Sequence, residues 1–188
     1  MYTYVHYTSP WEFPSLAASL RLAGVAPAMP CFLFTYHAHG SWLPDHPRGY
    51  VRRGLGVQAT DYRMAALYGE NLKSRVVVFE EASQRIMIEA VREACVCQAC
   101  HCHCISTESS HLHVLVSWDS DRTCQIARKQ LRYNAMRRLN ELIERREWFS
   151  KSPSRKQVKD VDHFNYLMTS YLPSHSGLKW SDECGVFR

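Results

Sequence analysis

The clearest alternation of polar and apolar positions lies at residues 110–118, which read SHLHVLVSW. Side chains of a strand point alternately to its two faces. His111 and His113 therefore share one face with Leu115 and Ser117, while the apolar residues between them share the other face. The pattern predicts a strand that buries one face in a core and carries two imidazoles side by side on the opposite face.

Further runs of strand length lie at 31–36, 75–79 and 97–106, and the last of these is predicted to form a hairpin with the 110–118 strand. Apolar residues at helical spacing predict four helices, at about 61–68, 80–95, 123–147 and 160–172. Residues 119–121 supply several N-cap candidates for the long third helix, and Asp160 or Asp162 supplies the N-cap of the last one. Residues 1–30 show no sustained period. They are predicted to be a partly ordered N-terminal extension of one compact domain over 31–188.

In the last predicted helix, apolar and aromatic residues recur at i, i+3, i+4, i+7 and i+8: Phe164, Leu167, Met168, Tyr171 and Leu172. This spacing places Tyr171 on the inward stripe. Five helical steps of about 100° turn Tyr166 roughly 140° away from it. Pro173 ends or kinks the helix, with His175 just beyond it. From the spacing alone, a core aromatic is the simpler interpretation of Tyr171.

Positive charge is concentrated in one part of the chain. The formal net charge is only +5, yet residues 122–159 hold 12 of the 23 Lys and Arg against three acidic residues. Within the helix predicted over 123–147, the basic side chains that point mostly outward are Arg128, Lys129, Arg132, Arg137 and Arg138. A solvated charged face is the alternative, but few acidic neighbours precede Glu141, so we expect these residues to bind a polyanion.

Eight cysteines are present, and five of them lie between Cys95 and Cys104. Alternate residues of a strand diverge, so these five are poorly placed to form disulfides with one another, and reduced thiols of a cytosolic protein fit better. No run of 18 apolar residues occurs, and the N-terminal stretch lacks the basic region that precedes a signal sequence. Neither a membrane span nor a signal peptide is therefore expected.

Two His-x-His pairs are candidate metal ligands. Neutral imidazole is the commonest side-chain ligand of metal ions, and two imidazoles on one strand face can hold an ion while leaving positions open for a substrate. His111 and His113 form the first pair. His37 and His39 form a rival pair where the first strand runs into a long loop, in which they are more simply loop histidines.

Taken in order, these elements resemble the single-tyrosine HUH transposases of small bacterial insertion sequences and the related REP-associated tyrosine transposases. The resemblance covers roughly 31–180. It rests on the strand SHLHVLV at 110–116, on the C-terminal segment from His163-Phe164 to Tyr171-Leu172-Pro173-Ser174-His175-Ser176-Gly177, and on the loop Gly40-Ser41-Trp42-Leu43-Pro44 with Arg48-Gly49.

The resemblance implies an α+β fold, a ferredoxin-like antiparallel sheet with helices on one face plus a C-terminal tyrosine-bearing helix, and an active site on the open face. His111 and His113 would bind a divalent cation, Mg²⁺ or Mn²⁺. The third ligand of the family is often a Gln four residues after the tyrosine, and here that position is His175. Tyr171 would cleave and rejoin single-stranded DNA through a 5′-phosphotyrosine intermediate. The implied setting is the bacterial cytoplasm, with single-stranded, hairpin-containing DNA as the partner, no membrane, and a homodimer as one assembly to consider.

Two alternatives stay open at this point. The first is a non-catalytic domain that binds single-stranded or hairpin nucleic acid through sheet aromatics and the basic helix. The second is a zinc-stabilised protein that uses the cysteine-rich stretch: Cys95, Cys97, Cys100, Cys102 and Cys104 with His101 and His103. Cys97-x-x-Cys100 has ligand spacing, but no second Cys-x-x-Cys pair follows it, so we expect no structural zinc.

Overall fold

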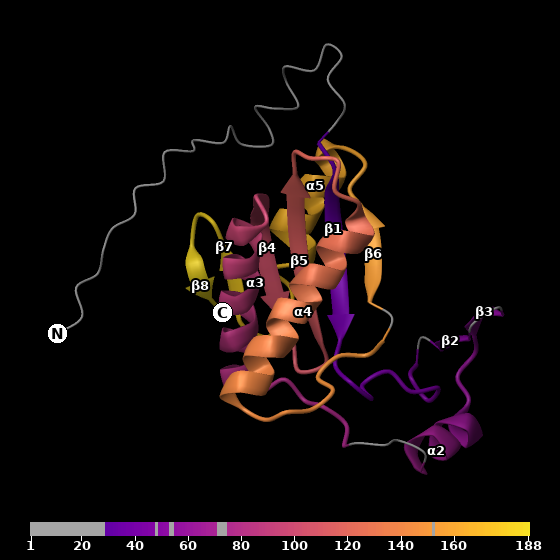
Figure 1. The fold of residues 1–188 in the computed structure, drawn as a ribbon. Coiled ribbons are helices and arrows are strands. Elements are labelled where there is room, and N and C mark those ends of the chain that lie inside the picture. Colours follow the sequence, from indigo (N-terminus) through magenta and orange to yellow (C-terminus); the bar gives the residue numbers. More distant parts are fainter. Residues whose placement is uncertain (1–28, 48, 53–54, 71–74, 152) are drawn as a thin grey trace.

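The computed structural model describes residues 29–47, 49–52, 55–70, 75–151 and 153–188 (Figure 1). The extension predicted over 1–30 lies outside the described residues except for Met29 and Pro30. These two residues precede the first strand and belong to no helix or strand.

Six strands form one sheet in which all neighbours are antiparallel, in the spatial order β6-β1-β5-β4-β7-β8. Their bounds are β1 Cys31–His37, β4 Cys100–Thr107, β5 His111–Trp118, β6 Ser154–Gln157, β7 Lys179–Ser181 and β8 Gly185–Phe187. Helix α3 (Glu81–Cys97) precedes β4, and helix α4 (Cys124–Leu142) links β5 to β6. The units β1, α3, β4, β5, α4 and β6 have the β-α-β-β-α-β order of a ferredoxin-like fold, which confirms the predicted fold class.

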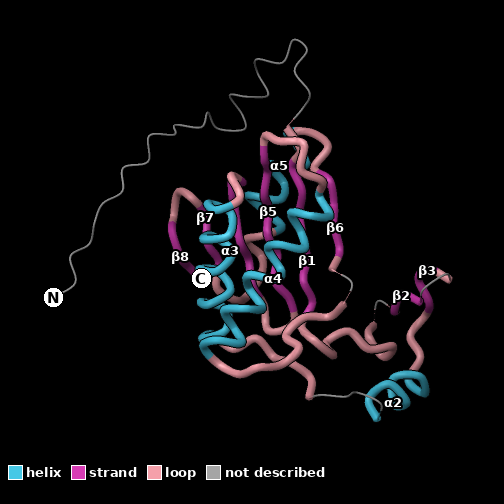
Figure 2. The backbone as a smooth tube through the Cα atoms, in the orientation of Figure 1, coloured by secondary structure: helices cyan, strands magenta, loops and turns pink. Residues whose placement is uncertain are grey.

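Helices cover both faces of this sheet. Helices α3 and α4 lie in front of the strands in Figure 1 and pack on the face that carries Phe34, Val114 and Trp118. On the other face, the short helix α5 (Val161–Tyr166) and the π-helical turn η1 (Leu167–Tyr171) pack against a smaller apolar cluster that includes Leu33 and Leu115. Figure 2 shows the same arrangement, with α5 behind the strands. The sheet is therefore the middle layer of three.

The long basic helix is shorter at both ends than predicted. Its N-cap is Thr123, whose hydroxyl accepts a hydrogen bond from the Ile126 N–H at 3.4 Å, and not one of residues 119–121. It ends at Leu142 because the chain turns back: the Asn140 side-chain oxygen accepts hydrogen bonds from the Arg146 N–H and from the indole N–H of Trp148. Burial of Trp148 beside the helix end thus stops the helix five residues before the predicted end at 147.

The segment at 75–79, predicted to be a strand, forms no strand, although its residues alternate in burial. Val77 and Phe79 are buried, while Val76 and Val78 are exposed. The backbone N–H groups of the two buried residues donate to carbonyls of separate loops, that of Val77 to His39 and that of Phe79 to Ser109, both at 2.8 Å. None of the described strands pairs with the segment, so it forms an extended connection and no ladder.

The predicted strand at 97–106 begins late, because Cys97 is still in α3 and β4 starts at Cys100. Between them Ala99 has φ of 49°, the left-handed region that usually holds glycine after a helix. Without a glycine, the sequence gives no sign of this helix end.

Strands β6, β7 and β8 were not predicted. All four residues of β6 are exposed at the sheet edge, and β7 and β8 have three residues each, so none of them shows a usable alternation. A separate hairpin of β2 (Tyr50–Arg52) and β3 (Gly56–Gln58) is followed by helix α2 (Tyr62–Glu70), which confirms the helix predicted near 61–68. Across the parts of the chain described here, no helix is both long and apolar enough to cross a membrane.

Candidate metal centre and tyrosine

Strand pairing places the histidines of β5 at the centre of the sheet. His113 pairs with Thr35 of β1 on one side and with Ser106 of β4 on the other, and His111 pairs with His37. Antiparallel partners project to the same face, so all five residues lie on the face that is opposite α3 and α4. The predicted phase of the 111–118 strand is thus correct: its histidines point away from the main core, which takes the residues between them.

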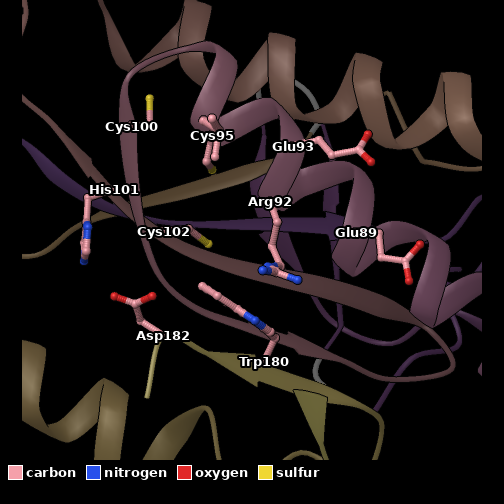
Figure 3. A pocket seen from close by; sticks show the side chains of 10 residues that line it. Glu89, Arg92, Glu93, Cys95, Cys100, His101, Cys102, Trp180 and Asp182 are labelled. Atoms are coloured by element: carbon pink, nitrogen blue, oxygen red, sulfur yellow. The ribbon is translucent and has the colours of Figure 1, made fainter. Parts of the chain in front are cut away.

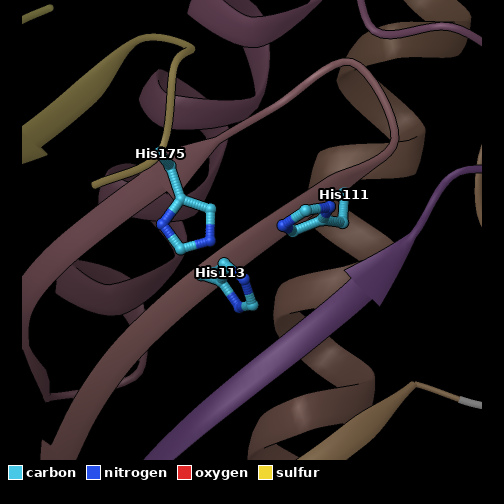
Figure 4. Close-up of side chains that lie close together, drawn as sticks. All are labelled: His111, His113 and His175. Carbon is cyan, nitrogen blue, oxygen red and sulfur yellow. The ribbon is translucent and has the colours of Figure 1, made fainter. Parts of the chain in front are cut away.

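A third histidine joins this pair, as Figure 4 shows. His175 comes from the turn after η1, and one ligand atom from each of His111, His113 and His175 lies within 4.8 Å of the other two. The ring centroids are separated by 4.6 Å, 4.6 Å and 5.3 Å. Among the described residues this is the one group of three or more His, Cys, Asp or Glu whose ligand atoms converge in this way. The three residues predicted as ligands are therefore brought together and could hold a metal ion.

The Nδ1 atom of each of these imidazoles contacts a protein oxygen. His175 Nδ1 lies 2.9 Å from the Tyr171 carbonyl, His113 Nδ1 lies 2.8 Å from the Thr35 hydroxyl, and His111 Nδ1 lies 2.9 Å from the Ser110 hydroxyl. A carbonyl can only accept, so His175 carries its proton on Nδ1 and presents the Nε2 lone pair. Such contacts orient metal-binding imidazoles and fix their tautomers, which makes Nε2 the ligand atom expected for all three.

Burial keeps the two β5 imidazoles neutral. It lowers the pKa of His111 to about 4, with the nearby His175 and His37 imidazoles adding to the effect and Glu108 opposing it. The pKa of His113 is lowered further, first by burial and then by the neighbouring histidines His111, His175 and His37. Neutral imidazole is the form that binds metals, so these two imidazoles can bind a cation at neutral pH without first losing a proton.

The resemblance implied an open face, but the sheet face that carries this group is covered. His113 is 3% exposed and His175 is 9% exposed, because α5, η1 and the turn after them cover the sheet. In this sheet, the face opposite α3 and α4 carries the apolar residues Leu33 and Leu115. The C-terminal segment packs on that face and buries them. Access to the histidines is therefore restricted to the edge of this cover, where His111 is only partly buried.

Tyr171 lies at the edge of the histidine group. Its hydroxyl oxygen is 3.4 Å from His113 Nε2, and its ring centroid is 5.4 Å from that of His113 and 5.0 Å from that of His175. The predicted inward stripe is also confirmed, since Leu167 and Leu172 are buried and Phe164 packs beside them. The helical period thus correctly placed Tyr171 on the sheet side.

The predicted orientation of Tyr166 is wrong. The helix changes to π geometry after Tyr166, with the Leu172 N–H bonded to the Leu167 carbonyl at 2.9 Å. The wider i→i+5 turn reduces the angle between residues five apart, so Tyr166 is turned away from Tyr171 by much less than 140°. The Tyr166 and Tyr171 ring centroids are 6.3 Å apart, and the Tyr166 side chain is 55% exposed.

Two buried polar side chains hold the turn that carries His175. The Lys179 ammonium donates to the His175 carbonyl at 2.7 Å and to the Gly177 carbonyl at 3.2 Å, although Lys179 is only 5% exposed. The Gln84 side-chain oxygen accepts from the Leu178 N–H and from the Thr107 hydroxyl, each at 2.9 Å. Neither residue was identified from the sequence, since an isolated Lys in a short strand and an isolated Gln in a helix give no signal.

Gly177→Ala is expected to displace this turn. A Cβ atom at Gly177 would overlap the Thr107 carbonyl oxygen and lie 2.8 Å from the Gln84 side-chain oxygen. We expect unfolding free energy to fall by roughly 1–3 kcal/mol and metal affinity to fall with it, measured by urea unfolding and calorimetry. Gly69→Ala is the matched control, because a Cβ there meets nothing within 4 Å and alanine is the better helix former. Equal effects of the two substitutions would contradict the tight fit at Gly177.

The rival pair at the end of β1 is split. His37 shares the face of the histidine group, with its ring centroid 6.0 Å from that of His111, and burial lowers its pKa. His39 instead points to Glu147, with its Nδ1 3.5 Å from a carboxylate oxygen. The two side chains therefore do not act as one ligand pair.

The predicted nucleic-acid-binding residues lie on α4, across the sheet from the histidine group. Arg128 and Arg132 donate to backbone carbonyls of Pro153 and Phe149, at 2.6 Å and 3.0 Å. The expectation of few acidic neighbours is wrong for the second half of the helix, where Arg137 and Arg138 pair with Glu141, and Arg138 also with Glu93. Lys129 is exposed. The structure thus does not place these five cations beside the tyrosine, and their contact with DNA stays a prediction.

The cysteine-rich stretch is divided between the two faces of the sheet. Cys95 and Cys102 lie on the side of α3, where a cavity of about 490 Å³ is also lined by Arg92, Trp180 and Asp182 (Figure 3). Cys104 belongs to the cluster on the other face, because the β4–β5 register shifts between Cys102 and Cys104. Among the described residues, the cysteines and histidines of the zinc alternative do not form a group of three converging ligand atoms.

His103, inside this irregularity, gives a pH-dependent prediction. Its Nε2 lies 2.8 Å from the Ser117 hydroxyl, and burial, assisted by His101, lowers its pKa to about 3. Between about pH 6.5 and pH 3 the unfolded chain binds a proton here that the folded chain does not, so stability falls as pH falls, by up to about 1.4 kcal/mol per pH unit. Urea unfolding of metal-free protein at several pH values should show a shallower decline for His103→Gln. The other buried histidines contribute to both proteins, so an unchanged slope would contradict the prediction.

The sequence matches no protein-family model and no curated protein. Among solved structures, the fold overlaps a candidate transposase from Deinococcus radiodurans R1 with a TM-score of 0.48 and 8% identity, over 82% of this chain and 97% of that one. It also overlaps a REP-associated tyrosine transposase bound to a REP hairpin, with a TM-score of 0.42 and 5% identity, over 78% of this chain and 68% of that one. Membership of the transposase family is not shown by these overlaps, and the function proposed below rests on the side chains.

Proposed function

We propose that the chain cleaves and rejoins single-stranded DNA as a metal-dependent transposase, with Tyr171 as the nucleophile. One observation carries the proposal: the Tyr171 hydroxyl lies 3.4 Å from Nε2 of His113, at the edge of three converging imidazoles. A tyrosine buried only for packing would need no such group beside its oxygen. A metal site without a nucleophile would not need the tyrosine hydroxyl at its edge.

The three histidines fit a divalent cation. Their Nδ1 atoms contact protein oxygens, which leaves three Nε2 atoms for a ligand, and the two β5 imidazoles are held neutral. When bound, the ion would polarise a phosphate oxygen and orient the phosphate for in-line attack. Mg²⁺ or Mn²⁺ is the ion expected from the resemblance. An all-imidazole set also suits Zn²⁺ and Ni²⁺, so these ions belong in the test.

The chemistry assigned to the chain itself is a transesterification. The Tyr171 oxygen forms a bond to a backbone phosphorus, and the bond from that phosphorus to the 3′ oxygen breaks. The phenolic proton passes to water, and the departing oxygen gains a proton to become a 3′ hydroxyl. One phosphate ester replaces another, so the reverse attack by a 3′ hydroxyl can rejoin a strand without an energy source.

Substrate choice follows from access. The site lies under a cover formed by α5 and η1, and His111 at its edge is only partly buried. A single strand can present one phosphate to such an edge, whereas the two backbones of a duplex are held at a fixed spacing. Single-stranded DNA, hairpin-containing in the sequence-based prediction, is therefore the proposed substrate.

The test is trapping of a covalent adduct. The protein is incubated with a single-stranded oligonucleotide labelled on the 3′ side of its cleavage position, with Mg²⁺, Mn²⁺, Zn²⁺ or a chelator. The expected product is a labelled protein band that survives denaturation, requires a divalent ion and disappears with the chelator. Tight DNA binding without any adduct would favour the non-catalytic binding domain instead.

A further inference from the structure

We infer that Tyr166 is a stacking subsite for a nucleobase of the DNA strand, next to the phosphate that Tyr171 attacks. The inference rests on the proposed function, because it needs a single strand at Tyr171. Its starting point is the π-helical turn, which moves Tyr166 from the position expected for a regular helix to one beside the nucleophile.

The exposure of Tyr166 is unexplained by packing. Its ring contacts that of Tyr171 at a centroid distance of 6.3 Å and an interplanar angle of 31°, yet 55% of the residue is exposed. Within the described residues, its hydroxyl has no hydrogen-bond partner and its ring has no other aromatic neighbour. A tyrosine that only filled the apolar cluster would be buried with Leu167 and Leu172.

The spacing suits a nucleotide. Bases of a single strand stack readily on exposed aromatic rings whatever their sequence. The Tyr166 ring centroid is 6.3 Å from that of Tyr171, so a base next to a phosphate at the Tyr171 hydroxyl is within reach of the Tyr166 ring. Tyr166 therefore offers an exposed ring face to an unpaired base.

A π-helical turn is less favourable than continued α-helix and needs compensation. In this short segment, Leu167 and Leu172 stay buried against the sheet, and the Tyr166 ring lies beside that of Tyr171. A stacking role for Tyr166 accounts for this irregular turn, which core packing alone does not require.

The experiment measures the affinity of metal-loaded protein for two single strands of equal length, an oligothymidylate and its abasic analogue. All variants carry Tyr171→Phe, so that no covalent product forms. Tyr166→Ala should weaken oligothymidylate binding by about 5- to 100-fold and leave abasic binding nearly unchanged, whereas Tyr166→Phe keeps the ring and should bind like the parent. Thermal unfolding confirms that each variant is folded, which is expected because Tyr166 is exposed.

Tyr62→Ala is the matched control, since Tyr62 is 75% exposed on α2, which carries none of the cations predicted to bind DNA. Equal oligothymidylate affinity of the parent and Tyr166→Ala overturns the stacking subsite while leaving the proposed function in place. Equal losses on both strands, or a larger loss for Tyr62→Ala, also overturn it. Absence of binding by the parent protein to either strand overturns the proposed function together with this inference.

Discussion

Tyr171→Phe is expected to abolish covalent attachment to single-stranded DNA while leaving binding within about twofold of wild type. The substitution removes only the oxygen that would attack phosphorus, and the ring keeps its contacts with His113 and His175. Because the attacking oxygen is lost, the adduct should fall below detection on a denaturing gel, at least a thousandfold by the usual effect of removing a nucleophile.

Tyr166→Phe is the control for this loss, since it removes the phenolic oxygen of a tyrosine that is 55% exposed on the preceding turn. Its adduct yield should stay close to that of wild type. If Tyr166→Phe eliminated the adduct and Tyr171→Phe did not, the nucleophile would be the wrong tyrosine. Their rings are only 6.3 Å apart, so this comparison is needed.

His111→Ala is expected to lower divalent-metal affinity on the order of 100-fold and to stop adduct formation. The side chain supplies one of three ligand atoms, and losing even a group that orients such a ligand costs 10–100-fold in affinity. Calorimetric titration with Mn²⁺ and with Zn²⁺ measures the change directly, without relying on DNA cleavage. His101→Ala is the control: it removes an imidazole from β4 that is not part of the converging group.

His111 is the suitable ligand to remove because it is only partly buried. His113 would be a poorer choice, since it is 3% exposed and its loss leaves the buried Thr35 hydroxyl without its 2.8 Å partner. That substitution should cost roughly 1–3 kcal/mol of stability, so a lost activity could reflect unfolding. Unchanged metal affinity in a folded His111→Ala protein would remove this residue from the proposed site.

The structure does not bring the predicted phosphate-binding residues of α4 to the tyrosine. The five cations of α4 were identified because Lys and Arg are concentrated in this part of the sequence. The helix forms there, but the sheet separates it from Tyr171. Which face of a sheet a helix covers depends on the chain connections and packing. Charge along a sequence carries no such information, and two of these arginines hold the 149–153 connection.

What the sequence determined by itself is the local geometry of the site elements. A period of two fixed which β5 residues face the main core, and a period near 3.6 put Tyr171 on the sheet side of its helix. Both results need only the repeat of the backbone, and they place His111 and His113 on one face of the sheet and Tyr171 toward it. The role of Tyr171 as nucleophile came from the family resemblance. His175 came from the family resemblance.

What only the tertiary structure decided is how these elements meet. Thr35 and His113 are 78 residues apart and Tyr171 and His113 are 58 apart, so their contacts depend on sheet register and on docking of the C-terminal segment. Gln84, one of the two side chains that hold the turn of His175, reaches Leu178 across 94 residues. The π turn, the cover over the histidines and the edge strands β6 to β8 arise in the same way, because packing against the finished sheet outweighs local preference there.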